Sequence, residues 1–337
     1  MERVTIRDVA KASNVSITTV SKALNGYSDV SEATKEKVLK AAKALNYVPN
    51  ASARSLGGIP EKTIALLTSS LKQRDESGYM YELISSIYNT CNKKGYEFIL
   101  LATDSLRQKE MTFLELCRHK NLDGAVVMGL NMDDAYYEEL KQSPIPCALM
   151  DMDIVGENIC LVSTNNKDAS CEAVTYLLQT GRREIAMING KRTANVSEER
   201  LSGYKEALES NGIALNPNYI VYTDFSAQDA LERAKALLTR YRKIDAIFCA
   251  SDLIAFGALT AASELNIKVP EGLSIVGFDG IFTSRYAFGG LTTVHQNYYK
   301  IGAKAAECVI NMVEKKYAPR RILINHELLV RNTTLHV

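Results

Sequence analysis

The seven residues SITTVSK, from 16 to 22, place hydroxyl groups, one amine and one branched apolar side chain at the spacing of a short helix. An inward face of apolar residues leaves four side chains outward: Ile17, Thr18, Ser21 and Lys22. Hydroxyl groups can bond to base edges, a lysine can reach guanine O6 or N7, and an isoleucine can contact a thymine methyl group. These types and this spacing predict a helix that enters the major groove of DNA.

Polar residues around this stretch are suited to phosphate contacts, and they are Thr5, Ser16, Thr19 and Asn25. Ser16 precedes the helix, so it can cap the helix and present its N-terminus to an anion. Phosphate contacts of this kind orient a protein on the duplex. In the alternative interpretation, these residues are only helix caps and solvated polar groups.

The flanking residues predict two further helices. Thr5 and Asp8 form a T-x-x-D capping signature, and apolar residues then recur at helical spacing. Asn14 tolerates the left-handed conformation of a tight turn. Two short helices joined by a sharp turn are a helix-turn-helix. Ser31 opens a third helix, expected from about 32 to 45.

Charge is spread unevenly along the chain. Residues 1–57 contain nine Lys and Arg and five Asp and Glu, so their formal charge is +4. The whole chain has a net charge of +1, which leaves −3 for the remainder. A basic head on a slightly acidic body is typical of a nucleic-acid-binding arm.

The chain of 337 residues, with 46% hydrophobic and 23% charged residues, is long enough for two or more domains with their own cores. No apolar run is long enough to span a bilayer, and MERVTIRDVA contains no signal-peptide core. Seven scattered cysteines form no CxxC pair or Cys/His cluster. We therefore expect a cytoplasmic protein with reduced, packed thiols, no metal site and no membrane association.

After Lys62, short β-rich runs alternate with helical stretches. The first series of runs covers residues 63–70, 96–104, 123–129 and 146–151. The second series covers residues 184–190, 219–225, 245–252 and 273–280. Alternating strands and helices predict parallel sheets covered by helices on both faces, and two series predict two doubly wound lobes. Ligands in such sheets bind at the carboxyl ends of the strands.

Four motifs of the head closely resemble the lactose/galactose repressor family. These motifs are T-I-x-D-V-A (5–10), N-V-S-x-x-T-V-S (14–21), V-S-x-x-T-x-x-K-V (30–38) and L-N-Y-V-P-N-x-x-A-R-S-L (45–56). The resemblance implies a helix-turn-helix domain over residues 1–48, followed by a hinge helix and linker over 49–61. It also implies that Leu56 wedges into the central base step of the operator, and an apolar wedge of this kind kinks the duplex. Asn50 would start the hinge helix, and the small Ala53 would allow close approach to DNA.

For residues 62–337 the resemblance implies a periplasmic-binding-protein-like body that binds an effector and dimerises. The N-lobe is expected at about 62–162 and 294–324, and the C-lobe at about 163–293 and 325–337. The last helix, about 298–315, and the strand after it are expected to help close both lobes. No heptad extension follows LLVRNTT, so we expect a homodimer on an inverted repeat of double-stranded DNA.

Side chains near strand ends are the candidate effector site: Ser69, Tyr79, Asp151, Arg200, Phe225, Asp279 and Gln296. In sugar-responsive members of the family, matching positions bind the small molecule. The chemistry suits a sugar or sugar phosphate, because carboxylates and Arg form charge-assisted bonds with hydroxyl groups, and Phe225 or Tyr79 offers an apolar floor. Asp252, also at a strand end, is interpreted as a helix cap.

The resemblance therefore implies a sequence-specific transcriptional regulator, a repressor of carbohydrate-utilisation genes under effector control. It is not expected to be an enzyme or to need a cofactor, because the chain contains no GxGxxG with a following acidic residue, no P-loop and no HExxH. One alternative is a carbon-catabolite regulator that needs a phosphorylated carrier protein. Another is a purine-type repressor that needs a corepressor. Purine-responsive relatives carry Arg and Thr where this chain has Ala194 and Val196, which disfavours the purine alternative.

Overall fold

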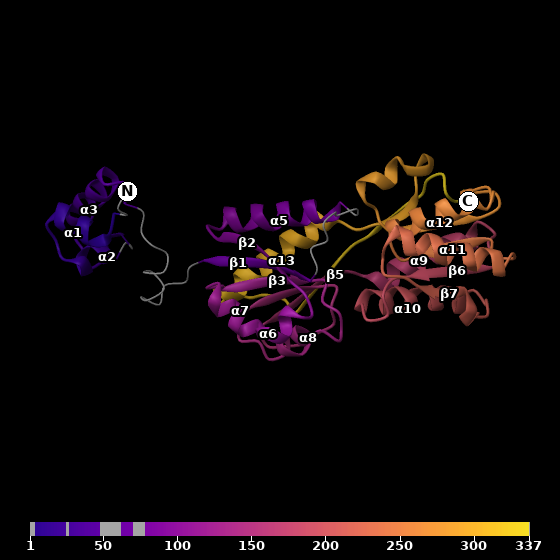
Figure 1. The fold of residues 1–337 in the computed structure, drawn as a ribbon, viewed down its shortest axis with the longest axis horizontal. Helices are drawn as coiled ribbons and strands as arrows, with labels where there is room; N and C mark the ends of the chain where they lie inside the picture. The colour runs from indigo at the N-terminus through magenta and orange to yellow at the C-terminus, as the bar shows by residue number, and fades with distance from the viewer. Residues whose placement is uncertain (1–3, 25–26, 48–61, 70–77, 337) are drawn as a thin grey trace. The chain divides into compact units, whose positions relative to one another are not determined.

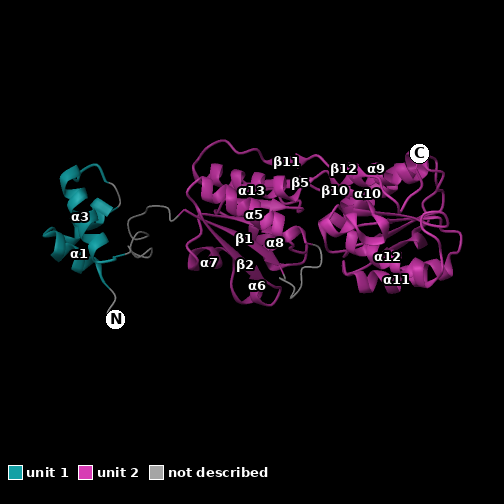
Figure 2. Cartoon of the chain, turned by 90° about the horizontal axis from the view of Figure 1, so that it is seen from above, with its two compact units in different colours: residues 1–61 teal, residues 62–337 magenta. Residues whose placement is uncertain are grey.

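The structure is a computed structural model, and it describes residues 4–24, 27–47, 62–69 and 78–336. The chain divides into two compact units, residues 1–61 and residues 62–337, which Figure 2 draws in different colours. The expected hinge at 49–61 lies outside the described residues, so its helix stays a prediction.

The described residues of unit 1 form three helices: α1 (Ile6–Ser13), α2 (Ile17–Leu24) and α3 (Glu32–Ala44) (Figure 1). Each helix contributes one fully buried valine, Val9, Val20 and Val38, to a shared core. Asn14 ends α1 in the left-handed conformation, with φ 48° and ψ 47°. Its amide-bearing side chain tolerates this region, so the chain can turn sharply into α2. The predicted helix-turn-helix and the third helix are confirmed.

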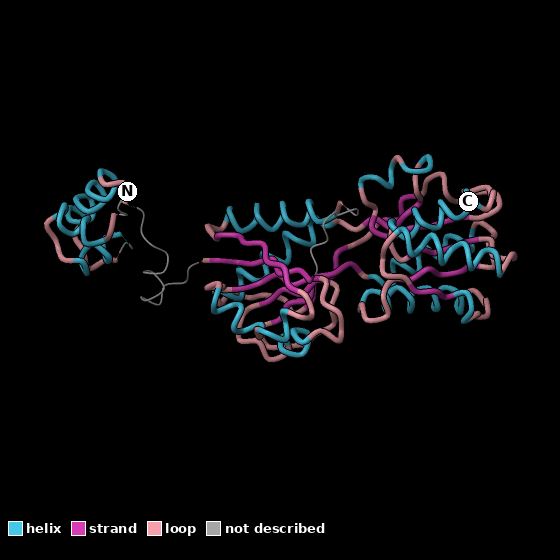
Figure 3. The backbone as a smooth tube through the Cα atoms, viewed as in Figure 1, coloured by secondary structure: helices cyan, strands magenta, loops and turns pink. Residues whose placement is uncertain are grey.

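Unit 2 contains two six-stranded sheets, one in each lobe, which appear as separate groups of strands in Figure 3. The first sheet has the order β11-β5-β4-β3-β1-β2. Its strands are β1 (Thr63–Ser69), β2 (Glu97–Thr103), β3 (Gly124–Met128), β4 (Cys147–Met150), β5 (Ile159–Thr164) and β11 (Arg321–Ile324). The second sheet has the order β12-β10-β9-β8-β6-β7. Its strands are β6 (Ile185–Asn189), β7 (Ile220–Tyr222), β8 (Ala246–Cys249), β9 (Ser274–Asp279), β10 (Thr292–His295) and β12 (Glu327–Leu329).

Helices pack on these sheets. Those of the first lobe are α5 (Tyr79–Lys93), α6 (Arg107–Glu110), α7 (Phe113–His119), α8 (Ala135–Leu140) and α13 (Tyr298–Val313). Those of the second lobe are α9 (Asn166–Gln179), α10 (Asn195–Ser210), α11 (Ala227–Arg240) and α12 (Asp252–Glu264). The part of the chain that the structure describes also contains three short 3₁₀ helices: η1 (Pro217–Tyr219), η2 (Phe282–Arg285) and η3 (Ala287–Gly289).

The pleat of β1 explains the two cores of the first lobe. Ile64 and Leu66 join the cluster that includes residues of α5 and α13, whereas Ala65 and Leu67 join the cluster that includes residues of α7 and α8. Successive side chains of a strand point to opposite faces, so one apolar run supplies both layers. The predicted doubly wound lobes are confirmed.

Two details of the strands differ from the sequence predictions. β5 was not among the predicted strands; it lies in the first sheet up to Thr164, paired with β11. β10 lies in the second sheet up to His295, two residues past the expected end of the C-lobe segment at 293. Backbone pairing with neighbouring strands decides where the chain passes from one lobe to the other. No local pattern in the sequence predicts this pairing.

β12 also departs from the expected parallel arrangement, because it pairs antiparallel with β10. β11 runs parallel to β5, so the chain leaves the first sheet at the carboxyl edge of its strands. The next strand, β12, then starts at the carboxyl edge of the second sheet, so it must run antiparallel to its neighbour β10.

No helix in the described ranges is both long and apolar enough to cross a bilayer. All seven cysteines are free thiols, six of them buried and Cys171 half-buried. Their burial agrees with the prediction that they pack as small apolar side chains.

Candidate functional site

The outward face of α2 is the candidate DNA-reading surface of unit 1. Ser16 caps the helix, because its Oγ accepts a hydrogen bond from the Thr19 amide at 3.0 Å, and its Oγ lies 2.8 Å from Thr19 Oγ1. Ile17 is 46% exposed although it is apolar, and Thr18 is exposed as well. An exposed isoleucine beside a free hydroxyl group is suited to a thymine methyl group and a base edge.

Thr5, like Ser16 and Thr19, is a described residue with a predicted phosphate contact. Its amide and its Oγ1 donate to Asp8 Oδ2 at 2.8 and 2.7 Å, which confirms the capping pair. These hydrogen bonds hold the pKa of Asp8 below its usual value. The Thr5 hydroxyl is therefore occupied within unit 1, and its contact with phosphate stays a prediction.

Lys22 has a partner that the sequence did not reveal. Its Nζ forms an ion pair with Asp29 Oδ2, in the turn between α2 and α3. Ser21 and Lys22 are half-buried rather than fully exposed. Asn25, Asn50, Ala53 and Leu56 lie outside the described residues, so their predicted roles are not addressed by the structure.

In unit 2, polar side chains from both lobes meet around Asp279, the last residue of β9. Asp279 Oδ1 accepts hydrogen bonds from Gln296 Nε2 at 2.9 Å and from the Tyr298 hydroxyl at 3.0 Å. Arg200 Nη1 lies 3.8 Å from the same oxygen. Burial raises the pKa of Asp279 to about 6, despite the opposing effects of Arg200, Tyr298 and Gln296.

Arg200, on α10, is held in place on several sides. Its Nε donates to Asn166 Oδ1 at 2.9 Å and its Nη1 donates to the carbonyl of Ala250. Its guanidinium lies 3.8 Å from the centroid of the Phe278 ring. The side chain is 4% exposed, so its charge depends on these protein partners and on Asp279.

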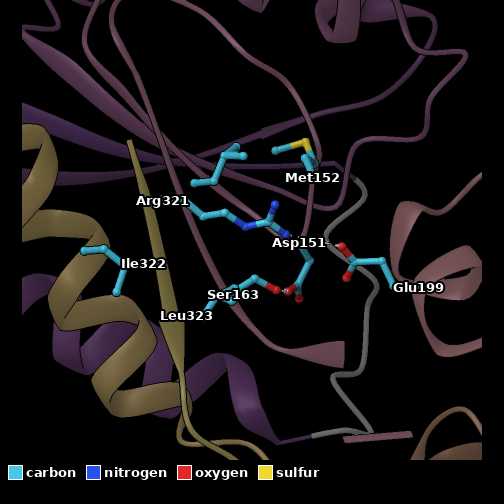
Figure 4. Close-up of a pocket in the computed structure, with 8 residues that line it drawn as sticks. Asp151, Met152, Ser163, Glu199, Arg321, Ile322 and Leu323 are labelled. Atoms are coloured by element: carbon cyan, nitrogen blue, oxygen red, sulfur yellow. Dashed lines mark hydrogen bonds and ion pairs between the residues drawn. The ribbon is translucent and has the colours of Figure 1, made fainter. Parts of the chain in front are cut away.

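A second group of polar side chains continues the site toward Asp151 (Figure 4). Ser163 Oγ donates to Asp151, and Asn166 Nδ2 donates to Ser163 Oγ at 3.1 Å and to Glu199 Oε2 at 3.0 Å. Glu199, from the second lobe, also lies 3.9 Å from Arg321 Nη2 of β11. Burial and the nearby Asp151 carboxylate raise the pKa of Glu199.

The pocket beside this group is small. It is lined by Asp151, Met152, Leu161, Ser163, Glu199, Arg321, Ile322 and Leu323, and its cavity volume is about 10 Å³, room for a single water molecule. Small-molecule sites usually measure about 300–1,000 Å³. We therefore treat this pocket as one part of the site between the lobes and not as the whole of it.

The structure connects five of the seven predicted effector residues. Tyr79 stacks on Tyr298 with ring centroids 4.5 Å apart, and Tyr298 contacts Asp279. Asp151, Arg200, Asp279 and Gln296 belong to the same continuous set of contacts. We call this set, together with Asn166, Ser163, Glu199, Tyr298 and Arg321, the interlobe network.

Among the described residues, no hydrogen bond or ion pair joins Ser69 or Phe225 to the interlobe network. Ser69 is buried at the carboxyl end of β1. Phe225 has φ 69° and lies against Gly190, where an added Cβ would be 1.9 Å from the phenylalanine Cζ. Their roles in effector binding stay predictions.

Sequence reasoning missed Ser163, Asn166, Glu199, Tyr298 and Arg321. Ser163 lies in β5, the strand that was not predicted, and Asn166 is the first residue of α9, just after it. Tyr298 lies two residues after Gln296, and Glu199 is the neighbour of Arg200, so proximity to predicted site residues was the available signal.

The interpretation of Asp252 as a helix cap is wrong. Ser251 caps α12, because its Oγ accepts from the Ile254 amide at 3.2 Å. Asp252 is fully buried and accepts from the Ile281 amide at 2.9 Å and from Thr293 Oγ1 at 2.5 Å. These hydrogen bonds connect α12 to β10 and to the segment after β9. Burial raises the pKa of Asp252 well above its usual value.

Within the described ranges, no group of three or more His, Cys, Asp or Glu side chains is placed to hold a metal ion.

Comparison with known proteins assigns a family to both units. The profile described as bacterial regulatory proteins, lacI family, matches residues 5–50. The profile described as periplasmic binding protein-like domain matches residues 174–334.

Full-length relatives agree with these matches. The chain is 37% identical to the ribose operon repressor of Halalkalibacterium halodurans over 331 residues, which covers 98% of this chain and 97% of that protein. It is 31% identical over 331 residues to the HTH-type transcriptional repressor PurR of Vibrio vulnificus, with 98% of both chains covered.

Among solved structures, the lac repressor dimer bound to operator and the anti-inducer ONPF is similar, with a TM-score of 0.84 and 25% identity. The alignment covers 99% of this chain and 100% of that one. The helix-turn-helix of unit 1, the paired lobes of unit 2 and these full-length relatives lead to one conclusion. The chain belongs to the lacI family of bacterial regulatory proteins and is a DNA-binding transcriptional repressor.

Proposed function

We propose that this repressor regulates carbohydrate-utilisation genes and is controlled by a neutral sugar bound at the interlobe network. One observation carries the proposal. The Gln296 carboxamide oxygen is fully buried and has no hydrogen-bond partner among the described residues. The carboxamide cannot turn round, because its nitrogen must face the Asp279 carboxylate, which only accepts. A buried acceptor without a partner is costly, and a ligand hydroxyl group would satisfy it.

Asp279 offers a second acceptor for the same ligand. Both side-chain hydrogen bonds that reach it from the described residues end on Oδ1. Oδ2 is therefore available to a second hydroxyl group, and hydrogen bonds to a carboxylate are stronger than neutral ones. Neighbouring acceptors of this kind favour a molecule with adjacent hydroxyl groups.

The charges of the network favour a neutral sugar over a sugar phosphate. Its carboxylates are Asp151, Glu199 and Asp279, and its cations are Arg200 and Arg321, a formal balance of −1. Arg200 lies beside Asp279, and Arg321 lies beside Glu199. A phosphate group would therefore compete with carboxylates for both of these arginines and would meet net negative charge.

An aromatic surface adjoins these polar groups. The ring planes of Tyr79 and Tyr298 are inclined by only 16°, and the Tyr298 hydroxyl is already bonded to Asp279. A sugar presents C–H groups on one face and hydroxyl groups at its edge, so a flat ring beside carboxylates suits it. The ribose operon repressor that is 37% identical to this chain supports the same class of effector.

Control of DNA binding follows from the position of the network. Its residues come from both lobes, and the backbone amide of Met132 in the first lobe donates to the carbonyl of Thr193 in the second at 2.9 Å. A ligand that favours one arrangement of the lobes changes operator affinity only if operator binding favours the other arrangement. We propose that two chains grip an inverted repeat, and that Asn50, Ala53 and Leu56 contact the operator between the two heads.

A second candidate effector is a purine, because relatives about 31% identical to this chain are named PurR. Ala194, the N-cap residue of α10, offers no side-chain hydrogen bond, and Val196 offers none either. Both positions carry polar side chains in purine-responsive repressors, so we favour the sugar.

Thermal unfolding of the purified full chain against sugars, their phosphate esters, nucleosides and purines tests the proposal. A ligand at about 100 times its dissociation constant stabilises the folded state by about 2.7 kcal/mol. We expect a shift with one neutral sugar, a smaller shift with its phosphate ester, and neither shift in Gln296→Ala. A shift with purines alone would contradict the sugar effector. No shift at all would favour the protein co-regulator.

A further inference from the structure

The ion pair between Lys22 and Asp29 joins the reading face of α2 to the turn that follows it. Lys22 lies in the last turn of α2, and Asp29 lies just before α3. The two side chains are 43% and 53% exposed, so the pair lies at the surface of unit 1. The carboxylate draws the Lys22 ammonium toward one point, and the hydrogen bond from Lys22 holds the pKa of Asp29 below its usual value.

The backbone on both sides of Asp29 is fixed by described contacts. The Tyr27 amide donates to the Lys22 carbonyl at 3.0 Å, which folds the turn back onto the end of α2. Val30 is buried in the core of unit 1, and Ser31 caps α3 through the Thr34 amide at 3.3 Å. Asp29 is therefore held near Lys22 by the fold, and the pair does not depend on a long flexible loop.

Stability of unit 1 does not require this pair. Exposed ion pairs add little to stability, since water screens the attraction and two side chains lose freedom. The Lys40–Glu36 pair on α3, with side chains 77% and 69% exposed, is a pair of the same chemistry away from the turn. It provides a matched control for the loss of one carboxylate from unit 1.

We propose that Asp29 is a positioning residue that makes Lys22 selective for guanine. The inference rests on the reading role proposed for α2. A free lysine is a flexible point charge that binds any nearby phosphate. An ammonium group has three donors, so one can stay on Asp29 while the other two reach O6 and N7 of a single guanine. On non-specific DNA, the neutralised Lys22 adds little to the salt-dependent affinity for phosphates.

Selection of duplexes from a library with a randomised inverted repeat tests this role in the full-length protein. The variants are Asp29→Asn, Lys22→Gln, the double variant and Glu36→Gln, and circular dichroism checks that each is folded. We expect Asp29→Asn to reduce the preference for guanine at one half-site position by about tenfold. The same variant should bind non-specific DNA more strongly. The salt dependence of that binding should become steeper by an amount that corresponds to at most about one additional phosphate contact.

The controls separate positioning from simple charge. Glu36→Gln makes the same charge change and should leave the base preference as in the parent. In the Lys22→Gln background, Asp29→Asn should change no base preference, because Asp29 acts through Lys22. An unchanged guanine preference in Asp29→Asn would overturn the proposal, and so would an effect that persists without Lys22. If the parent enriches no sequence, the reading role of α2 itself fails, which is a different result.

Discussion

The reading face of α2 and the interlobe network both depend on polar side chains, but they are assembled from different distances along the chain. In unit 1, Ile17 and Lys22 lie on one short helix, and Ser16 caps that helix through the Thr19 amide. In unit 2, Asp151, Arg200 and Asp279 come from separate elements of two lobes. The first surface is in contact with solvent, whereas Arg200, Asp279 and Gln296 of the second are buried.

This difference changes what each charge contributes. Lys22 and Asp29 remain in contact with water, so their attraction adds little to the stability of unit 1. Arg200 and Asp279 are desolvated, so each depends on its protein partners to stay charged. We expect mutations in the interlobe network to change folding stability first, and mutations on α2 to change DNA binding first.

Replacement of Arg200 tests the largest expected difference. Arg200→Ala leaves the buried Asp279 without its cation and Asn166 without a donor, and we expect a loss of roughly 3–5 kcal/mol in the free energy of unfolding. Arg321→Ala is the matched control, because Arg321 is 55% exposed, and should cost less than about 1 kcal/mol. The chain contains no tryptophan, so urea unfolding is followed by circular dichroism. Equal losses in the free energy of unfolding would show that burial does not make the Arg200–Asp279 pair more important for stability than the Arg321–Glu199 pair.

The pH dependence of unfolding tests Asp279 itself. Burial raises its pKa from 3.8 to about 6, so the folded state keeps a proton that the unfolded chain has already lost. The stability contributed by this group is therefore present at low pH and is lost as the pH rises through about 6. Between about pH 4 and about pH 6.5, we expect the parent to lose roughly 2 kcal/mol relative to Asp279→Asn.

The comparison with Asp279→Asn is needed because Asp252, Glu199 and Tyr298 in the same region also have raised pKa values. Urea unfolding of both proteins at several pH values measures the difference. Parallel curves over this range would show that Asp279 keeps an ordinary pKa in the folded protein.

The smallest expected difference is between replacements of the two serine caps of unit 1, Ser16 and Ser31. Ser16→Ala and Ser31→Ala each remove one hydrogen bond to a helix amide, and each should cost about 1 kcal/mol of stability. Only Ser16 begins the helix that faces DNA, so only Ser16→Ala should weaken operator binding beyond its effect on stability. Equal losses of operator affinity, measured under conditions where both variants are folded, would contradict the phosphate contact predicted for Ser16.

Much of unit 1 could be predicted because its signals are local. Capping by Thr5, Ser16 and Ser31 involves residues three positions away, and Asn14 determines the turn by its own conformation. The strands of unit 2 were also predicted where apolar runs were flanked by turn residues. β5 was missed, since its end at Thr164 depends on pairing with β4 and with the distant β11.

Short-range patterns of apolar residues, helix caps and strand ends were enough to predict the helix-turn-helix, the two doubly wound lobes and five residues of the interlobe network. The partners of these residues depend on tertiary packing. This packing placed Asp29 on Lys22, Tyr298 on Asp279 and Glu199 beside Arg321. These pairs form between separate elements, so packing determines which side chains meet, and desolvation then determines how strongly each pair affects the protein.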